Sequence, residues 1–502
     1  MKNFKLPSSV YNWLTLFGAM MAVGAILVFL FLLIISTFTG TSSSYLGLFM
    51  FIIIPPFLFI GLILIPIGMY YKNREIKRSG DKKLTAPVFD FNKSTHRNAA
   101  MVFITGSMIF LLLTALGSYE AFHFSESNVF CGEVCHSVMH PEFTAYQNSA
   151  HARVKCVECH VGEGVDWYVK SKLSGLRQIY GVATGDYDKP IPTPISNLRP
   201  ARETCEKCHW PEKFYSRTNR LEKHFLADEE NTPWDIYLTL KVGGEHNSEG
   251  LSEGIHWHVD PDNIVQYLAT DKQRQDIPFV RFINKKTGDT TIYIDSDSDF
   301  EMDEIANYEI REMECIDCHN RPSHQYLPPD RFINNELAKG TISTEIPEIK
   351  AKLLEICENE FVSIDSLKKY SMNEIIAYYE EEYPEVIEEN RAGIIASVDA
   401  FIKVYSDNIF PEMKVTWDKY PSNIGHMNFK GCFRCHNGLH ESEDGKVLER
   451  DCNQCHIINA QGSPDNFVRS EFNIPLDFQH PVDIGEAWMD MNCSECHTGL
   501  LP

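Results

Sequence analysis

The sequence predicts a membrane-anchored chain with three N-terminal transmembrane helices, followed by a mainly α-helical and irregular exported part with a small β-hairpin region. Three observations support this fold class. Long apolar segments occupy the first quarter of the 502 residues, a series of cysteine and histidine motifs follows them, and two β-branched runs flank a short polar turn.

The apolar segments are expected to be three membrane-spanning helices. They run from about 13 to 35, from about 45 to 71 and from about 99 to 121. Each is long enough for a bilayer, which needs about 20 residues per helix. The first has no small-residue cleavage site and is followed closely by the second, so it is expected to remain as an anchor. The prolines of the second span are expected to interrupt its hydrogen-bond ladder.

Basic residues orient these helices. The stretch 72–97 holds eight Lys and Arg residues and the amino terminus adds Lys2 and Lys5, whereas the 36–44 connection holds none. By the positive-inside rule, the amino terminus and the 72–98 loop lie in the cytoplasm. The third span then leads everything from Cys131 onward to the opposite side of the membrane.

Seven cysteine motifs follow the third span. Six read Cys-x-x-Cys-His, and the first, CGEVCH, has one extra residue between its cysteines. Their cysteines and histidines are Cys131, Cys135 and His136; Cys156, Cys159 and His160; Cys205, Cys208 and His209; Cys315, Cys318 and His319; Cys432, Cys435 and His436; Cys452, Cys455 and His456; and Cys493, Cys496 and His497.

This spacing is that of c-type haem attachment, because each cysteine forms a thioether with a haem vinyl group and the next histidine binds the iron. Zinc sites are the alternative, but zinc would not require a histidine directly after every second cysteine. The chain is therefore predicted to carry seven covalent c-type haems. Bacteria complete this attachment outside the cytoplasm, which agrees with the orientation above and predicts an inner-membrane protein with a periplasmic haem part.

Fourteen of the 15 cysteines belong to the motifs, which leaves only Cys357 on a predicted amphipathic helix. A disulfide framework is not expected, and Cys357 is interpreted as a buried inert thiol. Residues 1–98 carry a net charge of +7, so the remainder carries −30 of the total −23. This acidity favours solubility, with a docking surface for a basic partner as the alternative, and no nucleic-acid partner is expected.

The chain is expected to divide into five parts. These are a transmembrane anchor (1–123), a three-haem domain (124–235), a β-containing region with the fourth haem (236–330), a helical haem-free insert (331–425) and a C-terminal three-haem region (426–502). The hairpin is predicted in IPFVRFINKKTGDTTIYI, around a Lys-Thr-Gly-Asp turn. Apolar residues at three-and-four spacing predict helices between about 346 and 406.

Each iron needs a sixth ligand or keeps an open position. Five exported histidines close to motifs are predicted axial ligands: His151, His324, His426, His440 and His480. His246, His256 and His258 are weaker candidates for axial ligands, and a core or solvated histidine is the alternative for each. The first motif differs, because Met139 places a thioether near its iron.

The run FCGEVCHSVMHPEFTAYQNSAHARVKCVECHVGEGVDWYVKSKLSGLRQIYG, continuing to ETCEKCH, resembles the NapC/NirT family of membrane-anchored multihaem quinol dehydrogenases. Over its whole length, through CIDCHNRPSH, FPEMKVTWDKYPSNIGH, GCFRCHNG and DCNQCH, the chain more closely resembles ImcH-type seven-haem inner-membrane cytochromes. The resemblance implies that menaquinol is oxidised in the outer leaflet near the first haem. Electrons would then pass to periplasmic multihaem cytochromes.

The resemblance also implies particular residues at the first haem. In the family a methionine two residues past the motif histidine binds the iron; here Met139 stands three past His136, so both stay candidate ligands. Lys172 matches the family's quinol-site lysine, with Lys170 beside it, and Asp166 is the acidic candidate.

Glu120 and His123, where the third span leaves the lipid, are further candidates for the quinol site, because interfacial ionisable groups are often functional. A plain interfacial role for both is the alternative. A terminal reductase of a small substrate such as nitrite is another function considered, although such enzymes commonly carry lysine in place of one motif histidine. Reverse flow, as a quinone reductase, is a third.

Overall fold

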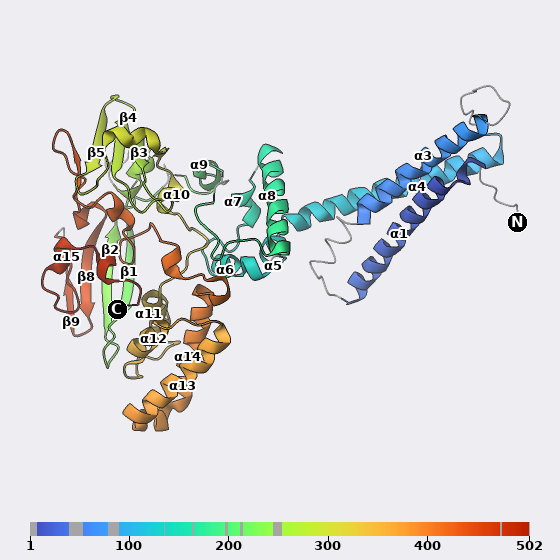
Figure 1. Ribbon diagram of the computed structural model, residues 1–502. Helices are drawn as coiled ribbons and strands as arrows, with labels where there is room; N and C mark the ends of the chain where they lie inside the picture. The colour runs from blue at the N-terminus through green and yellow to red at the C-terminus, as the bar shows by residue number, and fades with distance from the viewer. Residues whose placement is uncertain are drawn as a thin grey trace. The chain divides into compact units, whose positions relative to one another are not determined.

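Figure 1 shows the computed structural model of the chain, which divides into two compact units. One comprises residues 1–139 with 155–157, and the other comprises 140–154 with 158–502. The structure describes residues 8–39, 54–78, 90–134, 136–162, 165–195, 199–210, 214–243, 254–471 and 474–500.

Three long helices form most of the first unit: α1 (Trp13–Thr39), α3 (Ile54–Arg78) and α4 (Ser94–Ser125). Two helices, Trp13–Leu32 and Ile54–Arg78, are long and apolar enough to cross a membrane. The predicted first span lies within α1. The second lies within α3 from residue 54 onward, and its first part, 45–53, falls outside the described residues. The third predicted span lies inside α4, and its passage through the bilayer stays a prediction.

Small residues allow α1 and α3 to pack closely. A Cβ atom added at Gly18 would lie 2.7 Å from the Gly61 carbonyl oxygen, and one added at Gly61 would lie 2.8 Å from the Ala22 nitrogen. The Thr15 hydroxyl also donates to the Ile65 carbonyl oxygen at 3.3 Å. Such contacts between small residues are a common basis of helix association in membranes. Lipid tails are as apolar as the side chains, so close packing rather than the hydrophobic effect holds the helices together. Pro66 lies inside α3, which continues through it.

Most of the cysteine motifs form a single helical turn. Short helices begin at the first cysteine in α7 (Cys156–His160), α10 (Cys315–Cys318), η9 (Cys452–Gln454) and α16 (Cys493–Cys496). The motif at Cys205 follows α9 (Ala201–Cys205), and the one at Cys432 lies on η8 (Gly431–Arg434). Because residues three apart on a helix share a face, this turn brings both sulfurs of a motif to the same side.

The second unit contains two antiparallel sheets in its described part. The first has the order β1 (Thr218–Phe225), β2 (Pro233–Leu240), β8 (His456–Ser463) and β9 (Asn466–Arg469). The second has the order β6 (Ile310–Glu312), β3 (Asn263–Leu268), β4 (Phe279–Asn284), β5 (Thr290–Asp295) and β7 (His440–Ser442). In Figure 1, β1, β2, β8 and β9 lie side by side.

The predicted hairpin is confirmed as β4 and β5, which pair from Phe279 with Ile294 to Ile283 with Thr290. The β structure is, however, more extensive than the small hairpin region predicted. β7 pairs with β5 and β8 pairs with β2. The C-terminal three-haem segment therefore completes sheets begun some 200 residues earlier, a long-range pairing that local sequence patterns do not reveal.

The helices predicted between about 346 and 406 are confirmed as α12 (Ile349–Cys357), α13 (Ile364–Glu382) and α14 (Pro384–Asn408), and a further helix, α11 (Pro329–Lys339), precedes them. The helical insert has an ordinary hydrophobic core, in which Phe332, Leu353, Leu367, Val398 and Phe401 are fully buried. Cys357 is buried, and burial raises the pKa of its thiol, as expected for an inert residue.

Candidate haem sites

Six of the seven motif histidines each face a second histidine across a short gap. The ring centres are 6.0 Å apart for His209 and His151, 6.1 Å for His160 and His324, 6.3 Å for His319 and His256, 5.8 Å for His436 and His258, 6.1 Å for His456 and His426, and 6.0 Å for His497 and His480.

These separations fit an iron held between two imidazoles. A metal–nitrogen bond of about 2 Å and a distance of about 1.1 Å from nitrogen to ring centre place two axial rings about 6.2 Å apart. The observed range of 5.8–6.3 Å surrounds this value. Among the described residues, no group of three or more His, Cys, Asp or Glu side chains forms another kind of metal site. The donor set therefore fits haem, with its two axial histidines, better than zinc.

Four of the predicted distal histidines lie opposite a motif histidine: His151, His324, His426 and His480. His151 reaches the third motif, although it precedes the second, and His324 reaches the second, although it follows the fourth. The histidine that faces a motif thus comes from a distant segment of the chain. Proximity along the chain indicated these residues but did not indicate which motif each would face.

The structure does not place His440 as a ligand. Its ring is fully buried, with Nδ1 2.9 Å from the Asn437 Oδ1 and Nε2 2.7 Å from the Ile277 carbonyl oxygen. Both nitrogens are thus engaged, and neither is left for an iron. The expectation for His440 was wrong because nearness to a motif in sequence says nothing of what the ring contacts.

Two weaker candidates, His256 and His258, take the remaining positions. Both lie on the short helix η4 (Ile255–Val259), where they face His319 and His436 respectively. One turn of chain thus serves two neighbouring motifs. The signal in the sequence was the spacing, because two histidines two residues apart on a helical turn do not share a face and can serve different sites.

Main-chain carbonyls orient most of the distal histidines. Nδ1 lies 3.2 Å from the carbonyl oxygen of Pro322 for His151, 3.0 Å from that of Val242 for His256, 2.7 Å from that of Ile255 for His258 and 2.9 Å from that of Glu142 for His324. A carbonyl oxygen can only accept, so Nδ1 carries the proton. This leaves the Nε2 lone pair for the iron, an arrangement usual for metal-binding histidines.

Side-chain charges support one of these ligands in particular. Glu142 lies 3.1 Å from Nδ1 of His324 and binds Arg321 through both carboxylate oxygens, at 3.1 and 3.0 Å. The Arg321 guanidinium also lies 4.3 Å from the centre of the Tyr420 ring. Because Arg321 neutralises Glu142 and is itself held by an aromatic face, the carboxylate is fixed where it orients His324.

Burial keeps these imidazoles neutral. It lowers the pKa of His426 and of His436 to about 4, and it also lowers the pKa of His258 and His319. Only a neutral imidazole offers a lone pair to iron. At neutral pH these side chains are therefore in the form that binds a metal.

Consecutive motifs lie beside each other in chain order. In the first unit, a hydrogen bond from Cys131 lowers the pKa of the Cys156 thiol to about 7. In the second, a hydrogen bond with Cys315, then burial, then nearby Cys159 raise the pKa of Cys205. These contacts join the first motif to the second, and the second and fourth to the third.

The same order continues to the C-terminus. Burial and then Cys432 raise the pKa of Cys318 to about 11, and burial and then Cys432 raise the pKa of Cys455 to about 11. Burial and, less strongly, nearby Cys452 raise the pKa of Cys493. From the fourth motif to the seventh, each motif therefore lies next to the one that follows it in the chain.

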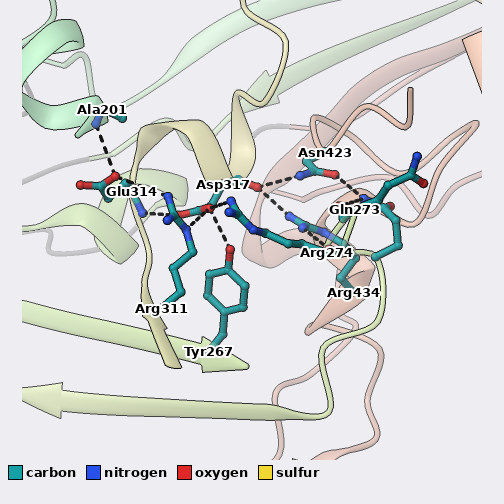
Figure 2. A network of polar contacts seen from close by, with 10 residues as sticks. Ala201, Tyr267, Gln273, Arg274, Arg311, Glu314, Asp317, Asn423 and Arg434 are labelled. Carbon is teal, nitrogen blue, oxygen red and sulfur yellow. Dashed lines mark hydrogen bonds and ion pairs between the residues drawn. The ribbon is translucent and has the colours of Figure 1, made fainter. Parts of the chain in front are cut away.

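Figure 2 shows a polar network that joins the fourth and fifth motifs. Asp317, inside the fourth motif and 2% exposed, accepts hydrogen bonds from Tyr267 at 2.8 Å, Arg274 at 3.0 Å and Arg311 at 2.8 Å. Its main-chain oxygen accepts one from Arg434 of the fifth motif at 2.9 Å. A buried carboxylate needs such partners, and they fix the two motifs relative to each other.

The first motif is described only in part. Cys131 belongs to α5 (Asn128–Glu133), whereas Cys135 and the His136 side chain lie outside the described residues. Met139, on α6 (His136–Gln147), is partly buried. The axial ligands of the first iron therefore stay a prediction.

The candidate quinol residues come from two helices. Glu120 and His123 are exposed on the last turns of α4, where the His123 ring lies 4.3 Å from that of Tyr119. Lys172 lies partly buried on α8 (Val165–Thr184), and the Asp166 side chain is outside the described residues. The two helices belong to different units, and the participation of these residues in one site stays a prediction.

Comparison with known proteins gives three matches. The N-terminal region of the NapC/NirT cytochrome c family matches residues 93–191. Cytochrome c-type protein ImcH of Geobacter sulfurreducens is 42% identical over 494 residues, which cover 98% of this chain and 96% of that protein. Cytochrome c-type protein NrfH of Wolinella succinogenes is 29% identical over 116 residues, which cover 22% of this chain and 65% of that protein. No solved structure matches the chain.

Proposed function

Because the chain belongs to the ImcH family of membrane-anchored electron-transport cytochromes with covalently bound haem, we propose that it is an inner-membrane quinol dehydrogenase. It oxidises menaquinol beside the first of seven haems and relays electrons to cytochromes in the periplasm. The observation that carries this proposal is the series of six facing histidine pairs in motifs that adjoin one another in chain order.

A relay needs irons that exchange electrons without binding substrate. Bound haem supplies a one-electron carrier, and two axial imidazoles leave its iron no position for a small molecule. Six described motifs have this arrangement, which supports a relay and speaks against a reductase with an open iron at any of them. Chemistry other than electron exchange is thereby confined to the first motif.

Oxidation of menaquinol to menaquinone releases two electrons and two protons, so the site must also hold and pass on protons. Lys172 suits this role, because an ammonium group hydrogen-bonds the quinol oxygen and stabilises negative charge as the proton leaves. Glu120 and His123 are proposed to carry the protons to the periplasmic water. Lys172 thus orients the substrate, and the interfacial groups remove its protons.

Helix α8 has the surface expected beside a lipid phase. Leu173, Leu176 and Tyr180 are each more than 60% exposed, and their spacing places them on one side of the helix. An amphipathic helix of this kind lies in the membrane interface, where a lipid-soluble quinol would reach it. This stripe supports a quinol site near Lys172.

The test is to add a soluble menaquinol analogue to the purified protein in detergent and follow haem reduction optically. We expect rapid reduction of the haem bands, with the fully reduced level set by dithionite. Haems that dithionite reduces but the quinol analogue does not would contradict the proposal.

Substitution on α8 then locates the site. Lys172→Met should slow quinol-dependent reduction about tenfold or more, because it removes one charge-stabilising donor. Arg177→Gln removes an exposed cation from the same helix and is the matched control. Equal rates in both variants would remove Lys172 from the site.

A further inference from the structure

The second haem site has a carboxylate beside its distal histidine. Nδ1 of His324 lies 2.9 Å from the main-chain oxygen of Glu142 and 3.1 Å from a carboxylate oxygen of the same residue. By contrast, His151, His256 and His258 hold Nδ1 against main-chain oxygens. Among the described residues, His324 is the one distal histidine with a carboxylate at ion-pair distance. Its ring therefore meets a charged group in addition to an orienting carbonyl.

An arginine fixes this carboxylate and gives the pair a direction. Nη2 of Arg321 donates to both carboxylate oxygens of Glu142, at 3.1 and 3.0 Å, and Nε donates to the main-chain oxygen of His324 at 2.5 Å. The guanidinium also lies 4.9 Å from the centre of the Tyr326 ring and 4.3 Å from that of Tyr420. The ion pair is neutral as a whole, but its negative end meets the imidazole.

Burial makes this charge effective. The side chain of Arg321 is 8% exposed and that of Glu142 is 18% exposed, so solvent and salt screen the pair weakly. A ferric haem carries one more positive charge than a ferrous haem. A carboxylate at Nδ1 makes the imidazole a stronger donor to the iron and thereby stabilises the ferric form.

We propose that Glu142 is a positioning residue that lowers the reduction potential of the second haem below that of the third. Its main-chain oxygen orients the ligand, and its carboxylate favours ferric iron. At the third haem, the facing His151 meets the main-chain oxygen of Pro322 instead. The inference rests on the proposed relay: one electron passes from the ferrous second haem to the ferric third haem, no bond is made or broken, and the step is downhill.

The unaltered protein gives the first test. The full haem-loaded protein in detergent is titrated with reductant at controlled potentials, and the low-spin signals are followed by electron paramagnetic resonance. Loss of one signal in His324→Ala identifies the second haem, and loss of another in His151→Ala identifies the third. We expect the second haem to be reduced at a lower potential than the third. The opposite order would overturn the proposal.

Substitution of the carboxylate gives the second test. Glu142→Gln removes the charge but keeps the size of the side chain and the main-chain oxygen that orients His324. We expect the second haem to stay low-spin while its ratio of ferrous to ferric iron at a fixed potential rises about tenfold, a shift of about 59 mV for one electron. An unchanged midpoint would overturn the proposal. Loss of the low-spin signal would also overturn it, because the carboxylate would then hold the ligand rather than tune its iron.

Two further variants separate this contact from a general loss of charge. Glu142→Asp keeps the carboxylate and should change the ratio less than threefold. Asp295→Asn is the matched control, because the Asp295 side chain is also 18% exposed and lies 3.9 Å from Nδ1 of His440, which is not placed as a ligand. It should change the ratio at the second haem less than twofold. A tenfold rise in Asp295→Asn would show that overall charge, and not the contact with His324, sets the potential.

Failure of this inference is distinguishable from failure of the proposed function. If the menaquinol analogue reduces the haems but Glu142→Gln leaves the midpoint of the second haem unchanged, the relay stands and the role of Glu142 is wrong. If the midpoint shifts as expected and quinol does not reduce the haems, the role of Glu142 stands and the quinol activity is wrong.

Discussion

Single residues define the iron sites through what their second ring nitrogen contacts. His256 and His258 each hold Nδ1 against a carbonyl oxygen, and the ring of each lies opposite that of a motif histidine. His440 is more deeply buried than either, and both of its nitrogens are within hydrogen-bonding distance of an oxygen. Because coordination needs a free lone pair, the hydrogen-bond partner of Nδ1 and the vacancy at Nε2 together distinguish a ligand from a structural histidine.

This distinction predicts opposite behaviour for two substitutions. His258→Ala should convert one haem from low to high spin, because the iron facing His436 loses its sixth ligand, and added imidazole should restore the low-spin state. His440→Asn should leave all low-spin signals in place while it lowers thermal stability. Electron paramagnetic resonance of the oxidised protein measures both, and a high-spin signal in His440→Asn would contradict the assignment.

Among the elements, α1 and α3 of the membrane anchor associate through glycine. A side chain at Gly18 would meet the Gly61 carbonyl oxygen at 2.7 Å, whereas one at Gly24, on the same helix, would meet no atom within 4 Å. Neighbouring glycines of one helix thus have different surroundings. Helix propensity alone would treat them alike, since both substitutions remove a flexible residue.

We therefore expect Gly18→Leu to separate the two helices and Gly24→Leu to be tolerated. Gly18→Leu should lower the midpoint temperature for loss of the monodisperse peak in detergent by about 5 °C or more, because the clash costs several kcal/mol. Size-exclusion chromatography after heating measures it. Equal stability of the two variants would show that this contact does not hold the anchor.

The helical insert contains a buried cation that makes its stability depend on pH. Lys350, on α12, is 1% exposed, and its ammonium group donates to the Phe225 carbonyl oxygen. Burial lowers the pKa of Lys350 to about 8, against the partial compensation of Asp330 and Asp228. Since the unfolded chain keeps the usual higher pKa, it binds more protons between about pH 8 and 10.5, and folding becomes more favourable as the pH rises through this window.

Lys350→Met removes this dependence. The difference in free energy of unfolding between the variant and the original protein should fall by about 2 kcal/mol between pH 7.5 and 9.5, because only the original protein gains stability over this range. One unit of pKa difference corresponds to about 1.4 kcal/mol. Denaturant titrations at the two pH values measure it. Lys352→Met, on the same helix, is the control and should show no such change; a pH-independent advantage of Lys350→Met would contradict the lowered pKa.

At the scale of the whole molecule, the second unit is held together by exchange between distant segments. β8 pairs with β2, and His324 faces the second motif from beyond the fourth. Segments that bind haem early in the chain therefore depend on segments made much later. Such a unit is expected to assemble cooperatively once its cofactors are attached, because its strand pairs and its histidine pairs join segments that lie far apart in the chain.

The complete protein is expected to carry seven haems. Intact-mass measurement should show seven added groups, and a Cys131→Ser, Cys135→Ser double variant should show six, because its first haem has no thioether. Cys357→Ser, outside every motif, should retain seven. A count of six in the unaltered protein would show that the longer first motif does not attach its cofactor.

The sequence by itself determined the anchor helices, the haem motifs, the hairpin and the helical insert, because each depends on residues close together in the chain. Apolar length, cysteine spacing and three-and-four periodicity are local properties that survive without tertiary structure. They also indicated His151 and His480 as ligands, since each lies near a motif in the sequence.

Only the tertiary structure showed which histidine faces which motif. His256 and His258 face two motif histidines, whereas His440, which was expected to be a ligand, does not. The tertiary structure also decided that C-terminal strands complete two sheets, which begin with β1 at Thr218 and with β3 at Asn263. The physical reason is the same in each case. Axial ligation and strand pairing can join groups that lie far apart in the chain. Local sequence patterns therefore do not indicate which partner a histidine or a strand will have. The seven motifs predict seven haems, and the fold places a second histidine opposite the motif histidine in six of them.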